Sequence, residues 1–580
     1  MTRRLIALRV GNFKAFADTQ RIPLKPITLI FGPNSAGKSS FIHSLALAHE
    51  AQFGRDKRGL ARLDVHHTEV GGSSIDLGGF RQYVHRGQTN RRVEWGVELM
   101  VASFGGRLAQ LLAPVNTITV TLSLGIELDD QERPKPGATP RVDAIEISAD
   151  SAELLRMSRR RSDAQGGLLR LDRLDVAHPV FRQVVKAIVE SATTSEEMRP
   201  EDFEGANMAI AGLLPELQVR IEQFFPTVVE LPRSEGVELS PVSLLFPVSK
   251  GNRREDIAQA VRFYLPRTIN DLVKGLSEVL ADELKHLQYL GPLRSFPPRH
   301  LAFAEYEDAN WYAGGGYAWD VVRRDDRVRE VVNGWLSSDK LKTPYQLMVR
   351  SLVALDQMAA PIEEGLLGLL GRTDEPIPFD SDELKELEDM NDEASVDGSF
   401  PTQADLDAQV EWLIGKIETS NADRMRELVL VDRRTNTVVT HRDVGIGISQ
   451  VLPVLVMAYG SQGKLIAMEQ PEIHLHPALQ AELGDVFIEA ALGERQNTFI
   501  LETHSEHLIL RLMRRMRETY FHKSTGLPSI TPADVSVLYV EPDGPRSIVR
   551  EMPLNELGEL VKSWPGGFFE EGLREQFGDA

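Results

Sequence analysis

The chain has 580 residues and no cysteine, and this absence excludes several kinds of site at once. Without thiols there is no disulfide framework, no cysteine nucleophile and no cysteine zinc site. Such a composition suits a reducing compartment, so we expect a cytoplasmic protein. A chain of this length is expected to fold into about two or three packed units rather than around one small core.

Long apolar runs and an excess of positive charge are also lacking. No uninterrupted apolar stretch is long enough to cross a bilayer, so no membrane association is expected. The formal net charge is −20 at pH 7, so any contact with DNA must come from a local basic patch. The most basic run, residues 158–161, is interpreted as a solvated helix face, and DNA contact is the minority alternative.

One stretch carries a specific chemical pattern. Residues 31–40, FGPNSAGKSS, match G-x-x-x-x-G-K-[ST] without a mismatch. A β-branched apolar run at 27–31 precedes the pattern, and apolar residues at helical spacing follow it, which is the strand–loop–helix context of a phosphate site. The candidate nucleotide-binding residues of this P-loop are Gly32, Asn34, Ser35, Ala36, Gly37, Lys38, Ser39 and Ser40.

Each part of this loop has an expected role. The glycines allow backbone N–H groups to turn inward around phosphates, and the helix N-terminus adds partial positive charge. We expect Lys38 to reach the terminal phosphates and the Ser39 hydroxyl to ligate Mg²⁺, so that the predicted cofactors are ATP and Mg²⁺. The alternative, a chance glycine turn, is disfavoured by the flanking elements.

The first half of the chain shows strand patterns followed by helical ones. Residues 5–10 are predicted as an edge strand leading to the P-loop strand, and 93–101, 117–124 and 142–149 alternate as half-buried antiparallel strands do. Residues 151–291 are predicted to be mostly helical, with Pro266 kinking or ending a helix, and 321–336 forms another helix. Residues 374–407 are acidic and are expected to be an exposed or partly disordered insertion; the alternative, an acidic metal-binding cluster, is disfavoured because no ligand spacing stands out.

An alternation of strands and helices returns from residue 428. Strands are predicted at 428–431, 464–468, 497–501 and 535–540, with helices at 449–459, 477–492 and 505–517. This alternation predicts a parallel sheet covered by helices. The predicted domains are an N-terminal half of the nucleotide-binding head (1–150), a mostly helical insertion (151–425), a C-terminal half of the head (426–545) and a tail (546–580).

Further site candidates follow the predicted strands of the second half. Glu469 ends an apolar strand, which is where a P-loop sheet holds Mg²⁺ opposite the P-loop hydroxyl. His504 lies just past the next strand and can bond a terminal phosphate or the attacking water, with a purely structural histidine as the alternative. The glycine loop 445–450 opens a helix and suits an anion brought by another subunit.

The order of these motifs resembles the ABC-type ATPases of the SMC, RecF and OLD kind. Residues 469–477, EQPEIHLHP, resemble the OLD-like branch of bacterial and phage ATPases, as do LGGF at 77–80 and YLGPLR at 289–294. The ending WPGGFF at 564–569 resembles the DUF3696 tail of the same group. The resemblance covers both ends of the chain and hardly touches the middle.

The resemblance implies an ABC-type P-loop head with a mainly parallel sheet and an antiparallel β subdomain, interrupted by the helical insertion. It gives Glu469 the Walker B role, His504 the role of the switch histidine, and makes Gln82 the candidate for the Q-loop glutamine. Sites of this type are completed by the signature loop of a second protomer, so an ATP-dependent homodimer is implied. The signature-loop candidates are Gly445, Gly447, Ser449 and Gln450.

The chain departs from the family pattern in two places. Gln470 stands where a glutamate usually acts as general base; glutamine can orient water but cannot accept its proton, so slow hydrolysis is expected. Glu472 is the substitute base. OLD nucleases carry a metal-binding Toprim domain after the ATPase, and no such acidic constellation follows His504, so no intrinsic nuclease is expected.

The resemblance therefore implies an ATP-gated switch in DNA maintenance or anti-phage defence, with the effector activity in a partner such as a nuclease or toxin. The alternative is an ATP-bound scaffold that does not hydrolyse ATP and holds that partner. Gln470 is the residue that favours the alternative.

Overall fold

The computed structural model describes residues 4–55, 61–159, 168–192, 199–231, 252–294, 310–337, 339–352, 410–412, 415, 425–439 and 446–565. The chain divides into a larger compact unit, Met1–Pro297 with Tyr306–Pro344 and His441–Ala580, and a smaller one, Pro298–Glu305 with Tyr345–Thr440. The acidic run 374–407, Arg160, Arg161, Gly445 and residues 566–580 lie outside the described residues. Among the helices that are described, none is both long and apolar enough to cross a membrane.

The larger unit contains a six-stranded sheet in the order β13-β17-β18-β3-β19-β20. Its first five strands are parallel and β20 is antiparallel to β19. All residues of β3 and β17 are buried, as expected for continuous apolar strands covered on both faces. The strands are β3 (Ile27–Phe31), β13 (Leu287–Leu290), β17 (Leu465–Glu469), β18 (Thr498–Glu502), β19 (Val535–Asp543) and β20 (Arg546–Glu551).

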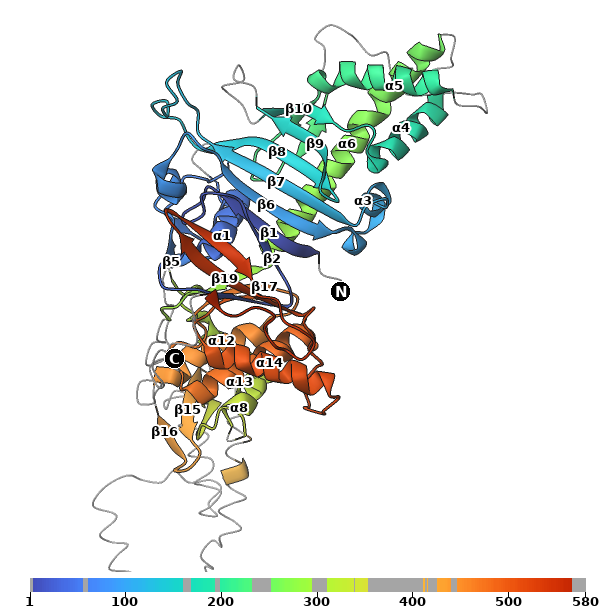
Figure 1. The fold of residues 1–580 in the computed structure, drawn as a ribbon. Helices are drawn as coiled ribbons and strands as arrows, with labels where there is room; N and C mark the ends of the chain where they lie inside the picture. The colour runs from blue at the N-terminus through green and yellow to red at the C-terminus, as the bar shows by residue number, and fades with distance from the viewer. Residues whose placement is uncertain are drawn as a thin grey trace, which may run out of the picture. The chain divides into compact units, whose positions relative to one another are not determined.

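The helices that accompany this sheet follow the predicted positions closely. Helix α13 occupies the predicted range, and α14 begins after Ser505, whose hydroxyl accepts a hydrogen bond from the Leu508 N–H at 3.1 Å. Figure 1 shows α12, α13 and α14 gathered beside β17 and β19. These helices are α1 (Ser40–Phe53), α12 (Ile446–Gly460), α13 (Pro477–Leu492) and α14 (Glu506–Tyr520).

The single helix predicted at 321–336 is wrong, because the structure has two helices there. They are α7 (Tyr317–Arg324) and α8 (Asp326–Leu336), separated at Asp325. The Asp325 carboxylate accepts hydrogen bonds from the N–H groups of Arg327 and Val328 and so caps a new helix. Both helices pack against α12.

A nine-stranded antiparallel sheet, in the order β12-β11-β10-β9-β8-β7-β6-β1-β2, forms the other layer of the larger unit. The predicted antiparallel strands β6, β7 and β8 are confirmed. The predicted edge position of the first strand is wrong, because β1 lies between β6 and β2 and belongs to this sheet, not to that of the P-loop. The strands are β1 (Leu5–Gly11), β2 (Gln20–Pro23), β6 (Val93–Met100), β7 (Thr117–Gly125) and β8 (Arg141–Ala149).

The region predicted to be mostly helical also contributes strands to that sheet. Its helices α4, α5 and α6 pack together at one end of the sheet, and Pro266 lies inside the 33-residue helix α6 without ending it (Figure 1). The elements are β9 (Ala152–Ser158), β10 (Leu168–Leu174), α4 (Pro179–Ala192), α5 (Pro200–Leu213), β11 (Gln218–Arg220), β12 (Val228–Glu230) and α6 (Arg253–Lys285).

The strand predicted at 428–431 exists, but it does not enter the parallel sheet. It is β15 (Met425–Asp432), which pairs antiparallel with β14 (Tyr345–Leu352) and β16 (Thr437–Val439) in a sheet of their own. The parallel sheet instead takes β13 from the predicted insertion, because a short apolar run does not specify its partner. The predicted class, an α/β P-loop head with a mainly parallel and an antiparallel sheet, is confirmed.

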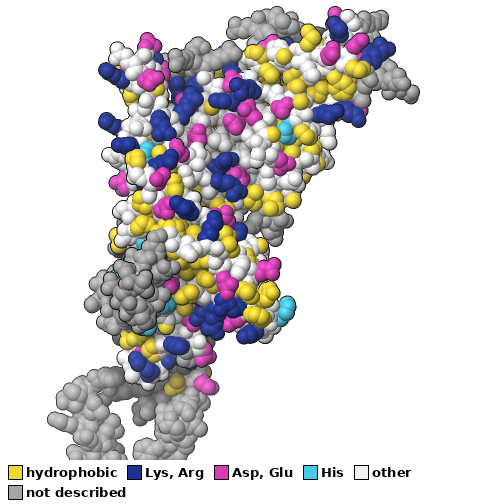
Figure 2. All heavy atoms as spheres, in the orientation of Figure 1, with side chains coloured by type: hydrophobic (Ala, Val, Ile, Leu, Met, Phe, Trp, Pro, Cys, Tyr) yellow, Lys and Arg dark blue, Asp and Glu magenta, His cyan; other side chains and the backbone are white. Residues whose placement is uncertain are grey.

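Charges of both signs are mixed on one face of the described residues (Figure 2). Figure 2 shows Lys and Arg side chains interspersed with Asp and Glu side chains over the visible face. A DNA-binding basic patch therefore stays a prediction.

Candidate functional site

The carboxyl ends of three neighbouring parallel strands bring the candidate residues to one edge of the sheet. The P-loop follows β3, Glu502 ends β18 and Glu469 ends β17. Glu469 and Glu502 lie opposite each other in the strand register. Ligands of open α/β sheets bind outside this edge, so the position fits a nucleotide site.

The P-loop needs glycine at two positions. Gly32 has φ +145°, and a Cβ there would lie 2.2 Å from the Val540 carbonyl oxygen. Gly37 has φ +94°, and a Cβ there would lie 2.3 Å from the Ala15 Cβ. Both backbone conformations are rare for other residues, so the sequence pattern has a steric cause. Helix α1 begins at Ser40 directly after the loop, which places a helix N-terminus there.

Lys38 lies deep in the loop with 4% of its surface exposed. Its Nζ donates hydrogen bonds to the carbonyl oxygens of Gly32 at 3.1 Å and Pro33 at 3.0 Å, and lies 3.8 Å from Glu502 Oε1. Burial lowers the pKa of Lys38, and the carboxylate of Glu502 is the largest effect opposing that change. The amine is thus held between the loop and an acid.

Ser39 pairs with a different acid from the one expected. Its Oγ donates a 2.6 Å hydrogen bond to Glu502 Oε2, whereas Glu469 was predicted to face this hydroxyl. The reason is the strand order, because β18 lies between β17 and β3. Glu502 was missed by the sequence reasoning, although it ends an apolar strand just as Glu469 does.

Glu469 is held by groups from two other elements. The Tyr289 hydroxyl of β13 donates a 2.9 Å hydrogen bond to Glu469 Oε1, and His43 Nε2 of α1 lies 3.6 Å from the same oxygen. Burial, with the Glu469 carboxylate second, raises the pKa of Glu502 to about 7. Two buried carboxylates and a hydroxyl supply the oxygen ligands that Mg²⁺ prefers, and a divalent cation would offset their excess negative charge, so the residues fit this metal.

Lys14 is a second lysine near the site, after Lys38, and the sequence reasoning missed it. It lies between β1 and β2, and its Nζ is 2.5 Å from His43 Nδ1. Burial lowers the pKa of Lys14 to about 8, although the carboxylates of Glu469 and Asp76 oppose this. No sequence signal connects a residue of the antiparallel sheet to the P-loop, because only the tertiary fold brings them together.

The residues after Glu469 lie close to β18. Gln470 has φ +47° and its N–H donates a 2.7 Å hydrogen bond to the Glu502 carbonyl oxygen. Glu472 is buried and accepts a 2.7 Å hydrogen bond from the His504 N–H. The structure thus joins Gln470, Glu472 and His504 to the same strand end.

His504 has an available imidazole nitrogen. Its Nε2 is buried and has no hydrogen-bond partner in the part of the chain that is described. Burial lowers its pKa, and the nearby Lys38 charge adds to this effect. A neutral imidazole at this place can donate or accept one hydrogen bond, as the predicted switch histidine requires.

The signature-loop candidates open α12, and Gly445 precedes the described part of this helix. Ser449 and Gln450 are 2% and 4% exposed. A Cβ at Gly447 would lie 3.3 Å from the carbonyl oxygen of His474, so the start of α12 packs on the loop after Glu469. Within one protomer, therefore, Ser449 faces the interior.

Gln82 lies in α2 (Phe80–Tyr83) with an exposed side chain. Its neighbour Tyr83 accepts a 2.7 Å hydrogen bond from the Lys14 N–H through its carbonyl oxygen. The described contacts bring α2 to Lys14 but do not join Gln82 itself to Lys38 or Glu469. Its Q-loop role stays a prediction.

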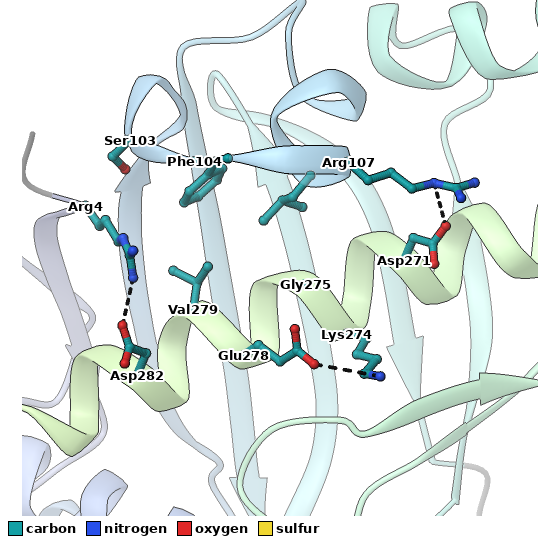
Figure 3. A pocket seen from close by; sticks show the side chains of 12 residues that line it. Arg4, Ser103, Phe104, Arg107, Asp271, Lys274, Gly275, Glu278, Val279 and Asp282 are labelled. Carbon is teal, nitrogen blue, oxygen red and sulfur yellow. Dashed lines mark hydrogen bonds and ion pairs between the residues drawn. The ribbon is translucent and has the colours of Figure 1, made fainter.

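A cavity elsewhere in the larger unit does not share these features. It has a volume of about 530 Å³ and lies between α6 and the loop leading into α3 (Gly106–Leu111), as Figure 3 shows. Its charged side chains pair with one another, and none of the nucleotide-site candidates lines it. The ion pairs are Arg4–Asp282, Arg107–Asp271 and Lys274–Glu278.

Family models match two segments of the chain that carry these elements. Residues 7–157, which include the P-loop, match a model described as "AAA domain". Residues 289–511, which include Glu469 and His504, match one described as "AAA domain, putative AbiEii toxin, Type IV TA system". Both segments are thus similar to AAA domains.

Solved SMC heads are among the similar structures. The Smc head domain with an extended coiled coil from Pyrococcus furiosus, bound to the C-terminal domain of ScpA, has a TM-score of 0.33 and 9% identity, covering 95% of this chain and 97% of that one. The SMC head domain from Thermotoga maritima has a TM-score of 0.30 and 9% identity, covering 95% and 99%. Comparison with curated proteins finds no match.

Proposed function

We propose that the protein is an ABC-type ATPase of the OLD-like kind, which binds ATP with Mg²⁺ at this sheet edge. The observation that carries the proposal is the contact of Lys38 and Ser39 with the buried carboxylate of Glu502, which lies opposite the buried Glu469 in the strand register. Lys38 would hold the terminal phosphates, while Ser39 and Glu469 would hold the metal, which offsets charge on the phosphates. Glu502 would accept a hydrogen bond from the Ser39 hydroxyl and so orient it.

Hydrolysis is proposed to be slow. Gln470 follows Glu469 and supplies hydrogen bonds without basicity. Glu472, the substitute base from sequence, already accepts a hydrogen bond from the His504 N–H. These features favour a long-lived ATP-bound state over rapid turnover.

The ATP-bound state is proposed to be a homodimer, in which the start of α12 faces the nucleotide of the second protomer. The half-buried Gly447 is the described residue of this loop best placed for such a contact, because Ser449 and Gln450 are buried within their own protomer. A backbone N–H at the start of a helix suits an anionic phosphate.

The dimer is proposed to gate an effector in DNA maintenance or anti-phage defence. The resemblance of EQPEIHLHP and of the DUF3696-like tail supports this setting, and the effector would be a partner such as a nuclease or toxin. No intrinsic nuclease is proposed. Contact with DNA would use local basic patches.

Steady-state phosphate release, with and without DNA, tests the ATPase against its rival, a scaffold that binds ATP without hydrolysing it. We expect slow release that disappears in Glu469→Gln, because that residue would hold the metal. If the wild-type chain releases phosphate no faster than Glu469→Gln does, the result would favour the scaffold. Gln470 favours the same alternative.

Two variants that exchange glutamate and glutamine, Gln470→Glu and Glu472→Gln, test which residue acts as the general base. Gln470→Glu is expected to raise the rate about 10-fold or more if general-base catalysis contributes its usual share. If Gln470→Glu is no faster while Glu472→Gln is inactive, Glu472 is the base and the slow-switch proposal is wrong.

A further inference from the structure

Arg294 is a buried arginine that joins two parts of the larger unit through backbone oxygens. Its Nη1 donates a 2.6 Å hydrogen bond to the Gln450 carbonyl oxygen, and its Nη2 donates a 3.0 Å hydrogen bond to the Gln470 carbonyl oxygen. Only 6% of the residue is exposed. Burial lowers its pKa to about 10, with the Glu472 carboxylate opposing, so it remains a cation at neutral pH.

The chain delivers this side chain to the sheet edge that carries the nucleotide site. Arg294 follows β13 by a short turn, and β13 pairs in parallel with β17, with Leu290 opposite Met468. The YLGPLR run therefore ends beside the residues that follow Glu469. Tyr289 of the same run donates to Glu469, so this segment contacts the site twice.

One of the two carbonyl groups belongs to the first turns of α12. Pro453 lies three residues after Gln450, inside the helix. The N–H that proline lacks would bond the carbonyl oxygen four residues earlier, that of Ser449. The Gln450 carbonyl oxygen has two lone pairs, so it can accept from a side chain besides the helix. Arg294 thus holds the end of α12 that carries Gly447 and Ser449.

The other carbonyl group belongs to the residue directly after Glu469. Gln470 has φ +47°, which is uncommon for a residue other than glycine. Its N–H bonds to β18 and its carbonyl oxygen bonds to Arg294, so contacts on both sides hold this conformation. A backbone shift at Gln470 would therefore change its bond to the guanidinium.

We propose that Arg294 is a positioning residue that links nucleotide binding at Glu469 and Gln470 to the placement of α12 in the same protomer. The inference rests on the proposed function, in which the start of α12 completes the site of a second protomer. Because the guanidinium is planar and rigid, its two N–H groups keep a fixed spacing between the carbonyl oxygens they bind. Movement of one carbonyl group then moves the other.

The test compares Arg294→Lys with Arg511→Lys. Lysine keeps the charge but cannot span two carbonyl groups with a planar fork. Arg511 is a matched control, because it is partly buried with 13% of its side chain exposed, bonds Glu482 and Asp485 between α13 and α14, and makes none of the described hydrogen bonds with Gln450 or Gln470. We expect both variants to bind ATP within about threefold of wild type by calorimetry on dilute protein, since Lys38 is intact.

Light scattering with ATP and Mg²⁺ then separates the two variants. We expect the protein concentration at half-maximal association to rise about 10-fold or more for Arg294→Lys and to stay near wild type for Arg511→Lys. Association of Arg294→Lys at the wild-type concentration would overturn the proposal. Equal losses in both variants would also overturn it, because they would indicate general destabilisation.

Hydrogen exchange on dilute wild-type chain, below the concentration of association, gives an answer that does not depend on how a variant folds. We expect ATP and Mg²⁺ to slow exchange in residues 32–39 and to change it in residues 447–452. In Arg294→Lys the first effect should persist and the second disappear. Protection of the P-loop with no change in wild-type α12 would refute the coupling. An unprotected P-loop would refute ATP binding itself, and the two failures are therefore distinguishable.

Discussion

Two glutamates, one predicted and one not, define the chemistry of the site at the scale of single residues. Glu469 was identified because an acid ends an apolar strand in a recognisable run. Glu502 ends β18 in the same way, yet its role depends on β18 lying between β17 and β3. Strand order is not encoded in local pattern, so the partner of the Ser39 hydroxyl could not be predicted.

Lys38→Ala should weaken ATP binding by roughly 100-fold or more, because the terminal phosphates lose a buried cationic partner. Isothermal titration calorimetry measures this. Lys25→Ala is a matched control, since the Lys25 Nζ also donates to two carbonyl groups, those of Pro532 and Val535, but precedes β3 at its other end. Equal affinity in Lys38→Ala and Lys25→Ala would mean that the P-loop does not bind the nucleotide.

The raised pKa of Glu502 predicts a pH-dependent stability. Its carboxyl has a pKa near 7 in the folded chain against 4.5 in the reference state, so the folded chain binds more protons between these values. Stability therefore falls as pH rises from about 4.5 to about 7, by up to about 3 kcal/mol from this group. Glu502→Gln, without nucleotide, should unfold at a higher temperature than wild type at pH 8.

The comparison over pH decides this prediction. Near pH 5 the glutamate is protonated in the folded chain and mostly ionised only in the unfolded chain, so just the first part of the stability loss between pH 4.5 and 7 has occurred and the difference between variant and wild type should shrink. A difference in unfolding temperature that is the same at pH 5 and pH 8 would show that Glu502 carries no such penalty. Thermal unfolding followed by fluorescence at both values provides the measurement.

At the scale of elements, the sequence predicted well which contiguous apolar runs form strands. It did not predict which strands pair with one another. Strands β3, β17, β18 and β19 were found because each is a short buried run between turns. Strand β13 was missed because it is four residues long and follows a long helix. Its place at the edge of the parallel sheet depends on contacts with β17, far away in sequence.

The break between α7 and α8 has a single-residue cause that can be measured. Asp325→Ala should lower the free energy of unfolding by about 1 kcal/mol, because the first N–H groups of α8 lose their acceptor. Asp325→Asn keeps a capping oxygen and should stay near wild type. Urea unfolding compares them, and equal stability of Asp325→Ala and wild type would show that the cap does not stabilise this helix start.

At the scale of the whole molecule, the P-loop, Glu469, Glu502 and His504 lie on one edge of one sheet, but two of the three described signature-loop candidates, Ser449 and Gln450, are buried. The sequence order of motifs implied a second protomer, and no local pattern could show that Ser449 is buried within its own chain. A large residue at Ser449 would disturb packing, so loss of association in such a variant would be ambiguous. The association of the wild-type chain therefore tests the dimer more directly than that of a Ser449 variant.

The most direct test of the account is the mass of the wild-type chain in solution with ATP and Mg²⁺, compared with ADP and with Lys38→Ala. One chain has a mass of 64.7 kDa. We predict twice this mass with ATP, and the mass of one chain both with ADP and for Lys38→Ala with ATP. A wild-type chain that binds ATP by calorimetry yet shows the same mass with ATP and ADP would contradict the account.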